Sequence, residues 1–262
     1  MIEEQLVTLS LPYPGRGERP VRVFVPAREE GEAFPVIYMT DGQNLFDVES
    51  SSFGCWYTRE AVRDERAKSG KAAVIVGIHN VDPWRTDELL PGSIGEIHCP
   101  EEARPYIKPE GEVFDDFVVH TVRSEVEAQF PVKTGRENTA FCGSSMGGLQ
   151  SFFTVLSHPD IFCAAGVLSP AFLFFSEEDL RRWVQGALRE EKPFLYLFSG
   201  AADELEKQIL KCTETAAAIL DECYPEEKLK LVIRPEERHH ETAWEPVFRD
   251  LLHLFLQQGE NT

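Results

Sequence analysis

Short apolar runs alternate with amphipathic helical patterns along most of this chain, and this order restricts the fold. Two strand-like segments, 4–11 and 19–26, flank a turn rich in Pro and Gly. Further strands are expected at 34–39, 72–79, 138–143, 161–170, 193–200 and 228–235. Helical spacing is found at 57–70, 112–130, 145–159, 180–188, 204–223 and 241–258. Such alternation predicts an α/β fold whose mostly parallel sheet has antiparallel N-terminal strands and helices on both faces.

The length and the net charge of the chain limit the kinds of molecule that it is expected to bind. With 262 residues, the chain is expected to form one domain over residues 1–262. Its net charge of -19 would repel phosphate backbones and anionic lipid headgroups, so neither nucleic acid nor a membrane is an expected partner. No apolar run approaches the length of a membrane span, about 18 residues. Glu3 and Glu4 make the N-terminus unlike a secretory signal.

The cysteine pattern favours a reducing compartment. None of the six cysteines forms a C-x-x-C pair, and none lies near a histidine at zinc-like spacing. We therefore interpret them as reduced thiols and expect a cytoplasmic protein, with disulfides as the alternative that their even number leaves open. No metal or organic cofactor is expected. One stretch, 80–111, is long and irregular, which is typical of segments that border a functional site. Within it, Trp84, Arg85 and Tyr106 are candidate substrate contacts, although ordinary loop packing would explain them equally well.

The segment "NTAFCGSSMGGL" contains a candidate nucleophile. The motif G-x-S-x-G fits only with Ser145 at its centre, flanked by Gly143 and Gly147. An apolar strand precedes it and a helical pattern follows, as a sharp strand-to-helix turn requires. The amide of Met146 would then lie at a helix N-terminus, available to an oxyanion. The alternative is a Gly-rich turn without chemistry. A phosphate-binding loop is disfavoured, because no G-K-[ST] follows.

A serine nucleophile needs a base and an acid that orients the base. On an α/β-hydrolase sheet the expected chain order is Ser, then Asp or Glu, then His. Asp203 follows a predicted strand at the right place, with Glu204 beside it, and Asp203 could equally be the cap of the next helix. His239 and His240 follow the last predicted strand. The residues alone leave open which acid and which histidine serve.

Several segments in order resemble the putative esterase family of the α/β-hydrolase superfamily, which is related to esterase D. They are "PVIYMTDGQNLFD", "VIVGIHN" with "RTDELLP", "ENTAFCGSSMGGLQS", "HPDIFCAAGVLSPAF" and "HHETAW". The resemblance implies the α/β-hydrolase fold and favours His239 as the base, through the pattern H-x-E-x-x-W, with Asp203 as the acid. It also implies an oxyanion hole formed by the backbone amides of Gln43 and Met146.

The resemblance implies a serine carboxylesterase that forms an acyl-enzyme on a small-molecule ester, such as an acyl-sugar, phenolic or siderophore-type ester. An acyltransferase that uses the same acyl-enzyme, or a binding protein that kept the fold without catalysis, are the alternatives. One difference from the wider group makes one activity unexpected. S-formylglutathione hydrolases of the wider group carry a cysteine where this chain reads "TDGQN", so that particular activity is not expected.

Overall fold

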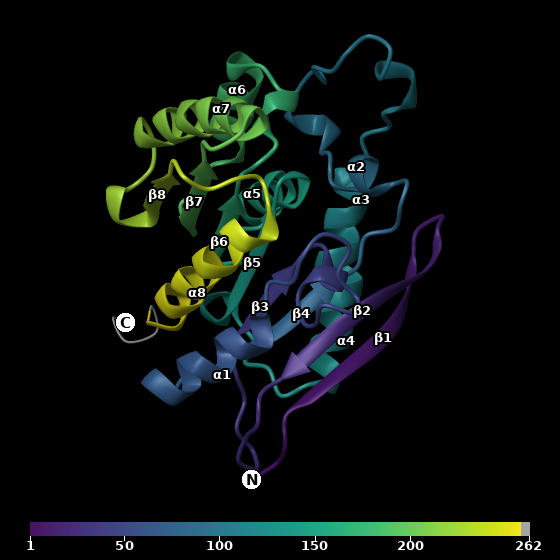
Figure 1. The fold of residues 1–262 in the computed structure, drawn as a ribbon, viewed down its shortest axis with the longest axis vertical. Helices are drawn as coiled ribbons and strands as arrows, with labels where there is room; N and C mark the ends of the chain where they lie inside the picture. The colour runs from purple at the N-terminus through teal and green to yellow at the C-terminus, as the bar shows by residue number, and fades with distance from the viewer. Residues whose placement is uncertain (258–262) are drawn as a thin grey trace.

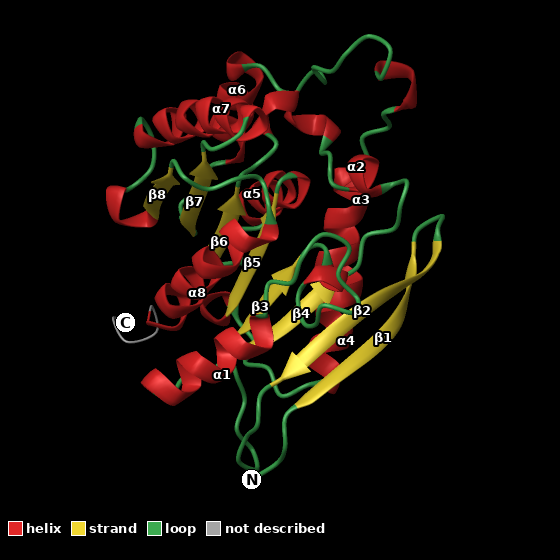
Figure 2. Ribbon diagram, in the orientation of Figure 1, coloured by secondary structure: helices red, strands yellow, loops and turns green. Residues whose placement is uncertain are grey.

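The computed structural model describes residues 1–257 and is built around one eight-stranded sheet (Figures 1 and 2). The strand order is β1-β2-β4-β3-β5-β6-β7-β8. Strand β2 runs antiparallel to both β1 and β4, and every other neighbouring pair is parallel. The strands are β1 (Gln5–Tyr13), β2 (Gly17–Val25), β3 (Val36–Met39), β4 (Val74–Ile78), β5 (Thr139–Ser144), β6 (Ala164–Leu168), β7 (Phe194–Gly200) and β8 (Leu229–Arg234).

Burial along the strands explains their order in the sheet. All residues of β3, β4, β5 and β6 are buried, because helices cover both faces of the sheet centre. The two edge strands, β1 and β8, contain many exposed or half-buried positions. A continuous apolar run therefore marks a central strand, and a mixed run marks an edge.

The described residues form eight α-helices in addition to this sheet. Figure 1 shows α1 and α8 side by side in front of the sheet, with α3 and α4 behind it. Helix α5 packs against β5 and β6, and α7 packs against β7. The helices are α1 (Thr58–Ser69), α2 (Arg85–Glu88), α3 (Gly111–Asp116), α4 (Arg123–Gln129), α5 (Met146–Ser157), α6 (Glu177–Ala187), α7 (Glu204–Asp221) and α8 (Glu241–Gln257).

The expected elements match those of the structure closely, with two refinements. The helix expected at 112–130 is a continuous helical stretch in which a π-type segment, Phe117–Val122, joins α3 to α4. The irregular segment 80–111 contains the short helix α2 and 3₁₀ turns at Gly92–Ile94 and Arg104–Tyr106. The final position of the helix expected at 241–258 lies outside the described residues.

A buried ion pair fastens the irregular segment to the N-terminal hairpin. Arg19 of β2 binds Glu88 of α2 through two hydrogen bonds, 2.8 and 2.7 Å, and both side chains are almost completely buried. Arg16 adds a further hydrogen bond of 2.7 Å to the same carboxylate. Removing one partner from such a pair would leave an uncompensated buried charge. The start of segment 80–111 is therefore held firmly against the sheet.

The described chain contains neither a disulfide nor a membrane-spanning helix. All six cysteines are unpaired thiols. Within residues 1–257, none of the helices combines the length and the apolar character that crossing a bilayer requires. The same residues contain no grouping of His, Cys, Asp and Glu side chains with the geometry of a metal site.

Candidate active site

Ser145 occupies a strained turn between β5 and α5. Its backbone has φ 58° and ψ -121°, a region that non-glycine residues rarely adopt. Small neighbours make this turn possible. A Cβ atom on Gly147 would lie 2.0 Å from Thr40 Oγ1, and one on Gly143 would lie 2.5 Å from the Gly147 carbonyl oxygen. The G-x-S-x-G motif thus presents Ser145 at the carboxyl edge of the sheet.

A chain of hydrogen bonds joins Ser145 to a buried carboxylate. The imidazole Nε2 of His239 lies 3.0 Å from Ser145 Oγ, and its Nδ1 lies 2.7 Å from Glu206 Oε1. The ring of Trp244 contacts the imidazole edge-on, with the centroids 5.0 Å apart. A histidine whose Nδ1 donates to a carboxylate keeps Nε2 free to accept the serine proton. The geometry is that of a serine, its base and an orienting acid.

The carboxylate that contacts the imidazole is that of Glu206, whereas the family resemblance favours Asp203. Asp203 lies just before α7 and caps this helix. Its Oδ1 accepts from the Glu206 amide at 2.9 Å, and its Oδ2 accepts from the His239 amide at 3.1 Å. These two backbone hydrogen bonds lower the pKa of Asp203, and the one from the Glu206 amide has the larger effect. The Asp203 carboxylate therefore anchors the loop that carries His239, while the imidazole ring turns to Glu206.

Helical spacing explains why Glu206 reaches the site. Glu206 is completely buried and shares one face of α7 with the buried residues Ile209, Thr213, Ala216 and Leu220. An acid on the apolar stripe of an amphipathic helix is unusual, since Glu is seldom buried without a partner. This spacing was readable in the sequence and would have separated Glu206 from its exposed neighbour Glu204, which pairs with Lys207.

The surroundings of Glu206 keep it ionised. Burial alone would raise its pKa. Hydrogen bonds from His239, Ser169 and Ser199, together with the imidazole charge, outweigh burial and lower the pKa. The second oxygen, Oε2, accepts from Ser199 Oγ and from the Gly200 amide, both at 3.0 Å. Ser169 is held in turn by a hydrogen bond from Trp244 Nε1 at 3.0 Å.

The second histidine does not take part in this chain. The side chain of His240 is 46% exposed, and its Nδ1 lies 3.1 Å from Thr242 Oγ1. Of the two histidines that the residues alone left open, the structure brings His239 to Ser145.

A cavity of about 450 Å³ opens at Ser145 and His239. Aromatic side chains and polar groups both line it, including Trp56, Trp244, Asn80 and Glu241. Arg85, one of the three candidate substrate contacts, lines this cavity. The other two are not among its lining residues. Trp84 is 39% exposed with the Arg16 guanidinium over its ring, and Tyr106 is 80% exposed.

Arg85 is fixed in the cavity wall by Asp41. Its Nε and one terminal nitrogen donate to the two Asp41 oxygens at 2.6 and 2.8 Å, and Asn80 donates to the same carboxylate. Burial alone would raise the pKa of Asp41, but the charge and hydrogen bonds of Arg85, with those of Asn80 and Thr40, lower it. The pair joins the loop after β3 to the loop after β4.

We expect Asp41→Asn to lower the free energy of unfolding by about 2 kcal/mol at pH 7, because it leaves Arg85 without its counter-charge. The folded-state pKa of Asp41 lies below its ordinary value of 3.8. The stabilisation is therefore complete above about pH 4 and disappears as the pH falls through the lowered pKa. Urea unfolding at pH 7 and pH 3 measures this difference. Asp82→Asn, at an exposed neighbouring position, serves as the control, and an equal loss in both variants would contradict the role of the pair.

The two amides expected to form an oxyanion hole belong to segments that touch. Gln43 lies in the 3₁₀ turn Gly42–Asn44 after β3, and Met146 is the first residue of α5, where amides have no partner within the helix. The segments meet where Gly147 packs on Thr40. A Cβ on Gly42 would lie 2.3 Å from the Gly77 carbonyl carbon, so this turn is also pressed against β4.

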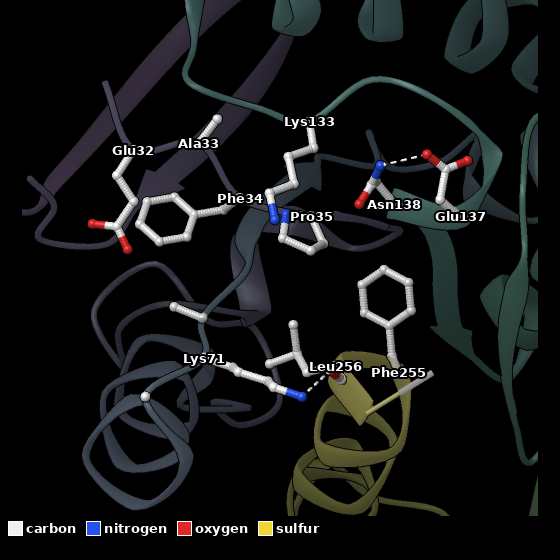
Figure 3. A pocket seen from close by; sticks show the side chains of 12 residues that line it. Glu32, Ala33, Phe34, Pro35, Lys71, Lys133, Glu137, Asn138, Phe255 and Leu256 are labelled. Carbon is white, nitrogen blue, oxygen red and sulfur yellow. Dashed lines mark hydrogen bonds between the residues drawn. The ribbon is translucent and has the colours of Figure 1, made fainter. Parts of the chain in front are cut away.

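A second cavity, of about 340 Å³, lies at the opposite edge of the sheet (Figure 3). Pro35, Ala72 and Asn138, which line it, precede β3, β4 and β5, whereas Ser145 follows β5. Two lysines and two glutamates also line it, and Lys71 donates to the Leu256 carbonyl oxygen at 3.1 Å. Among residues 1–257, no serine, threonine or cysteine lines this cavity. The cavity at Ser145 is therefore the candidate active site.

Comparison with known families agrees with this geometry. The family model described as "Putative esterase" matches residues 15–193, more than half of the chain. The chain belongs to this esterase family. The matched region contains Ser145, while Glu206 and His239 lie beyond it. No curated protein matches the chain.

Solved structures of esterases share the fold. The siderophore hydrolase EstA from Aspergillus nidulans is 21% identical, with a TM-score of 0.74 over 96% of this chain and 94% of that one. An IroE-like serine hydrolase from Shewanella oneidensis is 20% identical, with a TM-score of 0.73 over 96% and 80%. Ferric enterobactin esterase from Salmonella typhimurium is 18% identical, with a TM-score of 0.74 over 100% and 60%. The expected α/β-hydrolase fold is confirmed.

Proposed function

We propose that this esterase-family protein is a serine carboxylesterase that acts through an acyl-enzyme. The observation that carries the proposal is the pair of hydrogen bonds on one imidazole, 3.0 Å to Ser145 Oγ and 2.7 Å to Glu206 Oε1. A strained nucleophile turn, a base and a buried ionised acid meet at the mouth of one cavity.

In the first half-reaction, Ser145 Oγ attacks the ester carbonyl while His239 Nε2 accepts the serine proton. Glu206 holds the imidazole in the required tautomer and stabilises the imidazolium that forms. The backbone amides of Gln43 and Met146 donate to the developing oxyanion, each contributing roughly 10²–10³ in rate by comparison with other hydrolases. His239 then returns its proton to the departing alcohol, and the acyl group remains on Ser145.

In the second half-reaction, His239 removes a proton from a water molecule that attacks the acyl-enzyme. The tetrahedral intermediate collapses, the acid product leaves, and His239 returns the proton to Ser145. Every group in this cycle belongs to the described chain, and the cavity leaves space beside Ser145 for an acyl group and an alcohol.

A fluorophosphonate probe tests the nucleophile directly. The wild-type protein should be labelled once, with the mass increase on the peptide that contains Ser145, and labelling should abolish hydrolysis of p-nitrophenyl acetate and butyrate. Heat-denatured protein is the control, because an isolated serine hydroxyl does not react at an appreciable rate. A folded protein that neither reacts with the probe nor hydrolyses these esters would contradict the proposal.

A further inference from the structure

The arginine that the described residues place in the wall of the active-site cavity is already paired with a carboxylate. Among residues 1–257, Arg85 is the only arginine or lysine in the cavity wall. Both Asp41 oxygens already engage its guanidinium, at 2.6 and 2.8 Å. Asp82 and Glu241 add two further carboxyl groups to the wall. An anion that leaves water for this cavity would lose its hydration without gaining a counter-ion.

Negative groups also predominate on the other side of His239. An adjoining surface hollow is lined by three acids, Asp203, Glu236 and Glu237, and by one arginine, Arg238, together with the two histidines. The whole chain carries a net charge of -19. The charge near the site and the net charge of the chain therefore both repel an anionic substrate as it approaches.

Glu241 supplies a carboxylate acceptor in the cavity wall. Its side chain is almost completely buried at the start of α8, and Oε1 accepts a long hydrogen bond of 3.3 Å from Asn44 Nδ2. The backbone amide of Glu241 also donates to the carboxylate, while Oε2 lies 4.0 Å from His240 Nε2, beyond hydrogen-bond distance. A carboxylate oxygen accepts more than one hydrogen bond, so a hydroxyl group of a ligand in the cavity can donate to Glu241.

Aromatic surface accompanies these acceptors. Trp56 and Trp244 form part of the cavity wall, with their ring centroids 6.0 Å apart, and Phe53 lines the same cavity while 76% exposed. Apolar walls with a few polar groups that converge on one space are typical of small-molecule sites. This wall suits a ring or chain that is apolar on its faces and carries hydroxyl groups at its edge.

We propose that the ester is uncharged and carries hydroxyl groups, as an acylated sugar or polyol does, and that Asp82 and Glu241 reject anionic esters. This inference rests on the proposed esterase function. Charges a few ångströms apart at a half-buried site change kcat/KM by roughly 10- to 100-fold.

A matched pair of substrates tests the charge. At pH 8, we expect kcat/KM for methyl p-nitrophenyl succinate to exceed that for mono-p-nitrophenyl succinate by roughly 10-fold or more. The two esters differ only by the methyl group that removes the charge. Equal rates, or a faster anion, would overturn the inference while leaving the esterase function intact. If neither ester nor p-nitrophenyl acetate were hydrolysed, the esterase proposal would fail and this inference with it.

Variants test whether Glu241 and Asp82 cause the preference for the neutral ester. Glu241→Gln and Asp82→Asn should each reduce the preference for the neutral ester by about threefold to tenfold. Glu214→Gln, at an exposed position on α7, removes the same charge and should leave the preference unchanged. If Glu241→Gln failed to fold, the exposed position Asp82 would still decide the charge effect. An unchanged preference in Asp82→Asn would overturn the assignment to the cavity wall.

A second pair of substrates tests the hydroxyl groups. 6-O-acetylglucose and cyclohexylmethyl acetate both place an acetate on a six-membered ring, and only the first carries ring hydroxyls. We expect a kcat/KM roughly tenfold higher for the sugar ester, measured as acetate release by NMR. A preference for cyclohexylmethyl acetate would overturn this part of the inference, whatever the outcome with the succinates.

Discussion

Ser145→Ala should reduce kcat/KM for p-nitrophenyl acetate by about 10³-fold or more. The hydroxyl of Ser145 lies 3.0 Å from His239 Nε2, the nitrogen that accepts the serine proton in the proposed mechanism, and Ser145 lines the active-site cavity. Alanine fills the same space, apart from one oxygen, so the loss should fall on catalysis and leave the fold intact. Initial rates with acetate, butyrate and octanoate esters, together with thermal unfolding, measure both quantities.

The neighbouring serine offers a matched comparison. Ser144 ends β5 and has the same side chain, but the hydrogen bond to His239 goes to Ser145. Ser144→Ala should therefore retain activity within about tenfold of the wild type. Should Ser145→Ala remain active while Ser144→Ala loses activity, the nucleophile has been assigned to the wrong serine.

The order of strands and helices could be predicted because the spacing of apolar residues along the chain reflects which positions are buried. The wholly apolar run at β4 shows a strand covered on both faces, and the pattern of α5 shows a helix that starts directly after Ser145. The pairing partners could not be read from spacing. That β3 lies between β4 and β5 depends on how the segments pack in three dimensions.

The candidate site also has a part that the sequence predicts and a part that it does not. The motif G-x-S-x-G specifies Ser145, whereas chain order leaves His239 and His240 open and the family resemblance favours His239. The structure joins His239 to Ser145. The acid was expected too close to the strand end, because a carboxylate that caps a helix looks in sequence like one that orients a histidine. Trp84 and Tyr106 are candidates by residue type alone, within an irregular segment. Their direction depends on packing, such as the contact of Arg16 with the Trp84 ring, which a single sequence does not reveal.

Glu206→Gln tests the acid and should reduce kcat by roughly 10²–10⁴-fold. Glutamine keeps the shape of the side chain, but its amide can donate to Nδ1 and so favour the tautomer that occupies Nε2 with a proton. The neutral side chain also no longer stabilises the imidazolium. Activity should fall while the reduction in thermal stability stays small, because Ser199 Oγ and the Gly200 amide can still donate to the amide oxygen.

Asp203→Asn is the matched variant, because it removes one charge at the neighbouring carboxylate. Asparagine caps a helix about as well as aspartate, so α7 should remain intact, and kcat should change by less than about tenfold. Asp203→Ala removes the cap and the support of the His239 amide, and should cost about 1 kcal/mol of unfolding free energy. The two carboxylates can then be distinguished by their effects, because Glu206 should act on the catalytic rate and Asp203 on the stability of the fold. A large loss of kcat in Asp203→Asn with near-normal rates in Glu206→Gln would reverse the assignment, and would mean that the loop carrying His239 turns during catalysis to present the imidazole to Asp203.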